Sequence, residues 1–183
     1  MDLNIREATD SDSTAIDAVI RAAFDAAEGP AIASLATALA QDPTAAPQLT
    51  LVAMLDAAVV GVVAYSGVRI EGAAKGPRAS ILAPLAVRPD LQRRGIGRGL
   101  VEAGCARLAA DGVGLVFVLG DPAYYGRLGF VAAEAHGLVA PYPLVPAYTE
   151  AWRVRALQPD ALGQCSGRVG CAISLSDPKL WRP

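Results

Sequence analysis

The amino-acid sequence predicts one α/β domain with a mixed sheet, and three observations support that prediction. Helix-like and strand-like patterns alternate along the whole chain instead of separating into blocks. The run from Val113 to Leu119 is continuously apolar, as in a strand that is buried on both faces. Just before it, apolar residues recur at helical spacing from Ile96 to Leu108. With 183 residues and no low-complexity linker, residues 1–183 are expected to form a single domain.

The first part of the chain is expected to form four strands and two helices, separated by turn residues. In chain order these are a strand over 3–7, helices over about 11–26 and 31–40, and strands over 49–55, 59–70 and 80–87. The second and third strands, joined by a tight turn, are typical of an antiparallel hairpin. Pro84 lies inside the fourth strand, and it predicts a bulge or an edge because proline cannot donate to the ladder.

The second part begins with an amphipathic helix that is expected to end near Gly112. The buried strand over 113–119 follows it, and Asp121-Pro122 then begins a short helix that continues through Tyr125. Beyond this point the patterns are weaker. We expect strands over 130–133 and 168–175, with an irregular, proline-rich loop over 136–160 between them.

Composition and charge exclude several classes of protein. The chain is 53% apolar, which rules out intrinsic disorder even though 37 alanines inflate the figure. A net charge of −2 gives no basic face for nucleic acid, and no apolar run is long enough to span a membrane. The three cysteines and the single histidine, His136, do not form a metal-binding pattern. Because no signal peptide is visible, we expect a cytoplasmic protein without a metal, nucleic-acid or membrane partner.

The most informative motif is Gln92-Arg93-Arg94-Gly95-Ile96-Gly97, which joins a strand to a helix. A helix N-terminus carries unsatisfied N–H groups and a positive dipole end, and glycine lets an anion approach the backbone closely. Arg98 adds further positive charge. A dinucleotide-binding G-x-G-x-x-G pattern is excluded, since Leu100 occupies its last glycine position, and there is no Walker lysine. The loop therefore predicts one local site for an anion such as phosphate.

This loop resembles the Q-x-x-G-x-G pyrophosphate-binding motif of the GCN5-related N-acetyltransferases. Leu85-Ala86-Val87-Arg88-Pro89 is similar to the fourth strand of that family, and Tyr125-Gly126-Arg127-Leu128-Gly129-Phe130 to its Y-x-x-x-G-F segment. The stretch 120–130 is similar to a bacterial branch of YhbS-like predicted acetyltransferases. The resemblance covers roughly residues 3–175. It implies a central, mostly antiparallel sheet, splayed between its fourth and fifth strands and flanked by helices.

The resemblance implies an acetyl-CoA-dependent enzyme that transfers the acetyl group from the thioester to a primary amine by direct attack in a ternary complex. The coenzyme-binding residues that it implies are Leu85, Ala86, Val87, Gln92, Arg93, Arg94, Gly95, Ile96, Gly97, Arg98, Asp121 and Tyr124. Asp121 also has an alternative role. Because Asp-Pro is a common helix start, the sequence favours Asp121 as the cap of the short helix.

Catalytic roles follow from the same resemblance. Tyr125 matches the general acid of the family. A phenol suits this role because, with a pKa of about 10, it is protonated at neutral pH and can protonate the leaving thiolate. The adjacent Tyr124 is the alternative. Glu28 is the candidate general base, with another carboxylate such as Asp25, or water, as alternatives. A backbone amide near Leu85 would polarise the thioester carbonyl.

The sequence leaves the acceptor open, as a small-molecule or peptide amine. Residues 1–60 carry a local charge of −7 and residues 78–107 one of +4. An acidic N-terminal third would attract a cationic amine. Two alternative functions are a non-catalytic acyl-CoA-binding or sensing module and a protein N-terminal or lysine acetyltransferase. A homodimer is compatible with the sequence, as is a monomer.

Overall fold

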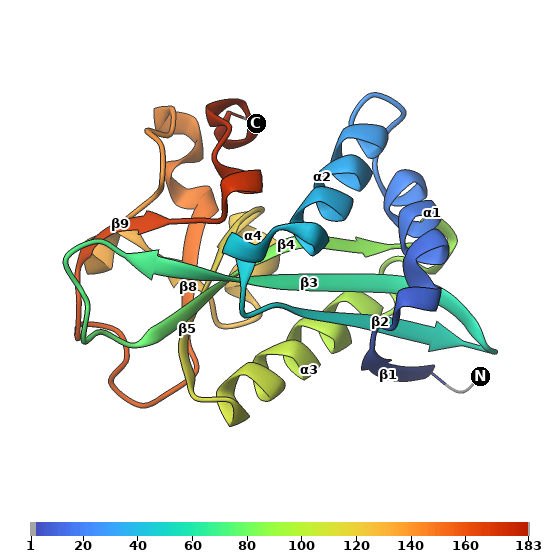
Figure 1. Ribbon diagram of the computed structural model, residues 1–183, viewed down its shortest axis with the longest axis horizontal. Coiled ribbons are helices and arrows are strands. Elements are labelled where there is room, and N and C mark those ends of the chain that lie inside the picture. Colours follow the sequence, from blue (N-terminus) through green and yellow to red (C-terminus); the bar gives the residue numbers. More distant parts are fainter. Residues whose placement is uncertain (1–2, 183) are drawn as a thin grey trace.

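The computed structural model describes residues 3–182, in which nine strands and four α-helices alternate along the chain (Figure 1). The strands are β1 (Leu3–Glu7), β2 (Leu49–Leu55), β3 (Ala58–Ile70), β4 (Arg78–Val87), β5 (Val113–Leu119), β6 (Val131–Ala132), β7 (Leu138–Val139), β8 (Trp152–Ala156) and β9 (Gly167–Gly170). The helices are α1 (Ser13–Ala23), α2 (Gly29–Gln41), α3 (Ile96–Ala110) and α4 (Pro122–Gly126). The main strand order is β1-β2-β3-β4-β5-β8-β6, with β9 pairing β3 and β7.

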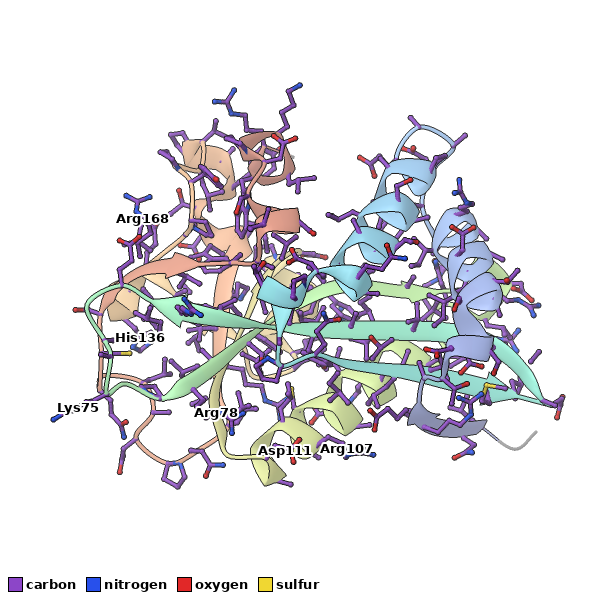
Figure 2. The ribbon with its side chains drawn as sticks, viewed as in Figure 1. Lys75, Arg78, Arg107, Asp111, His136 and Arg168 are labelled. Carbon is purple, nitrogen blue, oxygen red and sulfur yellow. The ribbon has the colours of Figure 1, made fainter. Side chains whose placement is uncertain are left out.

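Helices cover both faces of the sheet, with α3 on one face and α1 and α2 on the other (Figure 1). Successive residues of a strand point to opposite faces, so each strand feeds two cores. In β2, for example, Leu51 packs in the core beneath α3, whereas Val52 packs with Ile20 of α1. At its far end α3 is joined to the sheet by Arg78, whose guanidinium donates to the carbonyl oxygen of Asp111 at 2.6 Å (Figure 2).

The sheet opens between β4 and β5. These strands run parallel, and they pair only from Arg78–Ile81 to Val113–Phe117. Beyond this point β4 keeps its antiparallel partner β3, while β5 continues against β8. The predicted splay between the fourth and fifth strands, in a mixed and mostly antiparallel sheet, is thereby confirmed.

A bulge in β4 lies at the start of this opening. Val63 pairs with Leu85 and Tyr65 with Leu82, so that Ala83 and Pro84 together oppose Ala64 alone. The bulge that Pro84 predicted is therefore present. It bends the half of β4 that borders the opening.

Two predicted elements differ from the structure near the chain ends. The helix expected over 11–26 is a 3₁₀ turn over 10–12 followed by α1, which ends at Ala23. The Asp25 carboxylate then accepts the N–H groups of Ala27 and Glu28, at 2.9 Å each, and this forms a turn instead of more helix. The strand expected over 168–175 ends at Gly170, because residues 173–175 form a 3₁₀ turn.

The prediction of an irregular loop over 136–160 is wrong in part, because this stretch contains β7 and also β8, which lies between β5 and β6 in the sheet. Trp152 and Val154 are fully buried, while Arg153 and Arg155 alternate with them. Arg155 reaches Glu102 of α3 through two hydrogen bonds of 3.0 and 3.1 Å. The arginines and the prolines before them obscure a strand with the usual period of two.

Candidate functional site

A cavity of about 550 Å³ lies between the end of β4, the N-terminus of α3 and the segment around α4. Its position is the side of the opening where β4 and β5 no longer pair. Eleven residues line it: Leu85, Val87, Leu91, Gln92, Arg93, Gly95, Gly97, Arg98, Tyr124, Arg127 and Leu128. The structure thus brings together in one place eight of the twelve coenzyme-binding residues that the sequence predicts.

The loop before α3 is shaped to receive an anion. Gly95 has φ +85 and Arg93 has φ +59, so two left-handed residues turn the chain within three positions. No side chain of residues 3–182 caps α3, and the N–H groups of its first turn are left for a ligand. The Gln92 side-chain amide donates to the carbonyl oxygen of Val87 at 3.0 Å, which fixes the loop against β4.

The two adjacent tyrosines have different surroundings. Tyr124 lines the cavity, and its hydroxyl would lie 2.8 Å from a Cβ atom at position 97, so Gly97 leaves room for it. Tyr125 is only 8% exposed, and its ring packs against Phe130 and Gly120. The rings of the two tyrosines meet edge to face at 5.0 Å. Burial raises the pKa of both phenols, more strongly for Tyr125, so both are protonated at neutral pH.

The other predicted coenzyme-binding residues lie outside the cavity lining. Ala86 alternates with Leu85 and Val87, and its side chain packs on the opposite face with α1. Ile96 is buried in the core beneath α3, and Arg94 is exposed. These residues can contribute only backbone groups or long-range charge to a ligand in the cavity.

Asp121 caps α4, as the sequence favoured, because its carboxylate accepts the N–H of Ala123 at 2.8 Å. Glu28, the candidate base, is exposed at the start of α2 and does not line the cavity. The only histidine, His136, is exposed in the turn before β7 (Figure 2). Consequently no carboxylate or imidazole lines the cavity.

Three lining residues, Leu91, Arg127 and Leu128, were missed by the sequence reasoning as site residues. Each stands next to or inside a recognised motif, so proximity to the motif was the available signal. Within residues 3–182 no cluster of three or more His, Cys, Asp or Glu side chains is placed to hold a metal ion. Over the same residues, every helix is too short or too polar to cross a membrane.

Comparison with known proteins identifies the class. A family model described as an acetyltransferase (GNAT) domain matches residues 46–132. The chain is 36% identical over 143 residues to YjhQ, an uncharacterized N-acetyltransferase of Escherichia coli, covering 76% of this chain and 77% of YjhQ. The chain therefore belongs to the GNAT family of acetyltransferases, and the predicted family and enzyme class are confirmed.

Within this family the chain is similar to YhbS of E. coli, with 36% identity over 159 residues that cover 86% of this chain and 89% of YhbS. The crystal structure of YhbS in complex with CoA matches with a TM-score of 0.85 and 34% identity, covering 96% of this chain and 92% of that one. A GNAT acetyltransferase from Brucella melitensis in complex with acetyl-CoA matches with a TM-score of 0.70 and 29% identity, covering 96% and 99%. The predicted YhbS-like branch is confirmed.

Proposed function

We propose that this protein binds acetyl-CoA in the cavity beside α3 and transfers its acetyl group to a primary amine by direct attack in a ternary complex. The observation that carries the proposal is the combination of an uncapped α3 N-terminus with a strand opening next to it. The N–H groups of residues 93–98 would hold the pyrophosphate. The pantetheine arm would lie along Leu85 and Val87, whose side chains line the cavity.

The bulge in β4 supports a role in polarising the thioester. Pro84 has no N–H group, so Leu85 supplies the first backbone donor after the bulge. An N–H group held by a sheet can stabilise the negative charge that develops on the thioester oxygen without reorganising. We assign this role to the backbone of Leu85.

The general acid is assigned to Tyr125, which stands at the first position of the family's Y-x-x-x-G-F segment. Its raised pKa keeps the phenol protonated, as a donor to the leaving thiolate must be. Tyr124 lines the cavity, and we assign it to coenzyme positioning. Tyr125→Phe should lower kcat by roughly 100-fold or more, while Tyr124→Phe should mainly raise KM for acetyl-CoA. The reverse pattern would move the acid role to Tyr124.

Glu28, the candidate base, lies outside the cavity lining, so water is the alternative acceptor for the proton of the amine. Glu28→Gln should leave kcat/KM unchanged if water takes the proton, and should remove the acidic limb of its pH profile if Glu28 does.

We further infer that residues 1–183 act as one cytoplasmic acetyltransferase domain, as a monomer or a homodimer. The acceptor would be a cationic small-molecule or peptide amine, drawn by the acidic N-terminal third.

The direct test is a thiol-release assay with acetyl-CoA and a panel of cationic, neutral and anionic amines, the first group including lysine peptides and peptides with free N-termini. Acceptor-dependent release that is fastest with cationic amines at low salt supports the proposal. Calorimetric binding of CoA without acceptor-dependent release on the whole panel would favour the non-catalytic acyl-CoA-binding alternative. Release with peptides alone would favour the protein acetyltransferase.

A further inference from the structure

The arginines of this protein divide into two groups. Eight of the fourteen have a hydrogen bond or ion pair from the guanidinium to another described residue. The guanidinium groups of the other six have none within residues 3–182: Arg69, Arg93, Arg94, Arg98, Arg127 and Arg182. Three of these six line the cavity beside α3. Half of the arginines that have no partner among the described residues therefore line one cavity.

The cavity beside α3 also differs in charge from the other described cavities. Arg93, Arg98 and Arg127 line it, and no carboxylate does. The other three described cavities each include at least one aspartate or glutamate, such as Glu71, Asp12 or Asp17. Only this cavity, among those described, therefore presents positive side chains with no internal counter-charge. Such a surface fits a ligand that carries several negative charges.

Arg127 reaches this cavity from a different part of the chain than the other two. Arg93 and Arg98 belong to the loop before α3 and to its first turn. Arg127 lies later in the chain, directly after β5 and α4. Its side chain lines the cavity together with that of Tyr124. Tyr124 in turn lies against Gly97 of the loop. The cavity is thus positively charged on two sides.

We propose that Arg127 binds a phosphate group of the coenzyme from the α4 side of the cavity, whereas Arg93 and Arg98 lie on the α3 side. The inference rests on the proposed use of acetyl-CoA. A guanidinium suits this role because it presents a planar fork of donors that matches two phosphate oxygens. CoA offers two such targets, the pyrophosphate and the 3′-phosphate of the ribose.

Calorimetric titration with CoA and with 3′-dephospho-CoA tests the proposal on the intact protein. We expect Arg127→Gln to weaken CoA binding by about tenfold. Arg127→Lys should recover part of this loss, since lysine keeps the charge but not the fork of donors. Arg69→Gln is the matched control, because Arg69 is also exposed and unpartnered but lines a different cavity. Loss for CoA alone identifies the 3′-phosphate, and equal loss for both ligands identifies the pyrophosphate.

The proposal is overturned if Arg127→Gln binds CoA within twofold of the wild type, as Arg69→Gln should. It is also overturned if Arg127→Gln and Arg127→Lys lose affinity equally and both melt at a lower temperature, since that result indicates a structural role. Failure of the wild type to bind CoA would instead overturn the proposed function, so the two failures are distinguishable.

Discussion

Charged side chains have different surroundings in two regions of the molecule. One region is the cavity beside α3, and the other is the junction around Asp42, where residues 42–45 contact residues 173–175. In the cavity, Arg93, Arg98 and Arg127 have no partner among the described residues. Asp42, between α2 and the next 3₁₀ turn, is only 9% exposed and is surrounded by donors. Its carboxylate accepts the N–H of Thr44 at 2.8 Å and the N–H and hydroxyl of Ser174 at 2.8 and 2.7 Å.

Under the proposed function, the difference separates residues that would bind a ligand from residues that stabilise the fold. Exposed, unpartnered guanidinium groups contribute little to stability, because water solvates them well until an anion arrives. A carboxylate with many donors is ionised throughout the physiological range. The Thr44 hydroxyl and then the N–H and hydroxyl of Ser174 hold the pKa of Asp42 well below its usual range. Substitutions in the first region should change binding, and those in the second should change stability.

The largest expected effect comes from Gly97→Val. A Cβ atom at this position would lie 2.8 Å from the Tyr124 hydroxyl, and the added methyl groups would fill the approach to the loop before α3, where we propose that phosphate binds. We expect CoA affinity to fall by roughly 100-fold or more, by calorimetry, with little change in melting temperature. Gly170→Ala is the control, since its Cβ would meet nothing closer than 3.8 Å. A large fall in melting temperature for Gly97→Val would break the proposed separation.

The second prediction concerns the junction. Asp42→Ala removes the acceptor that joins residues 42–45 to residues 173–175, so it should lower the melting temperature by roughly 5 °C. CoA affinity of the folded variant should stay within twofold of the wild type. Glu71→Gln, an exposed carboxylate without a hydrogen bond among the described residues, should change neither quantity. Weakened CoA binding in Asp42→Ala would show that the two regions are coupled.

These two regions also differ in how far the sequence predicts them. The loop before α3 is local: strand, glycines and helix follow one another without interruption between Arg78 and Ala110, and their pattern is visible without the fold. The junction joins residues that lie 132 positions apart. The local sequence pattern contains no sign that Ser174 contacts Asp42. The pattern therefore predicts a strand where residues 173–175 form a 3₁₀ turn. Tertiary contact decides the local structure there.

The same distinction applies inside the candidate site. Gly95, Gly97 and Tyr124 were predicted and line the cavity, because each belongs to a contiguous motif. Glu28 was predicted from the family resemblance, by its place between the two N-terminal helices, and the structure leaves it exposed and outside the cavity lining. Arg127 lies within a recognised motif but was not assigned a role, since only the cavity shows where its charge is placed. A contiguous sequence motif therefore predicts the residues of the loop before α3 better than it predicts which side chains from other elements lie opposite this loop.

The third prediction uses pH to isolate the junction. Because the folded pKa of Asp42 is depressed, its contribution is present above the unfolded value of about 3.9 and is lost as pH falls below it. The difference in melting temperature between wild type and Asp42→Asn should be constant from about pH 7 to 5 and should shrink below about pH 4. Other depressed carboxylates, such as Asp12 beside Arg6, are present in both proteins and cancel. A difference that persists or widens in acid would contradict this account of Asp42.

The smallest expected effect is that of salt. The guanidinium groups in the cavity are exposed to solvent, so ions screen their attraction for phosphate, whereas the donors around Asp42 act at hydrogen-bond distance in a buried site. Raising NaCl from about 50 to 500 mM should weaken CoA binding by about threefold to tenfold, and less in Arg127→Gln. The stability difference between wild type and Asp42→Asn should not change over the same range. If salt leaves CoA affinity unchanged, backbone N–H groups and apolar contacts hold the coenzyme, and the charge of the cavity contributes nothing measurable.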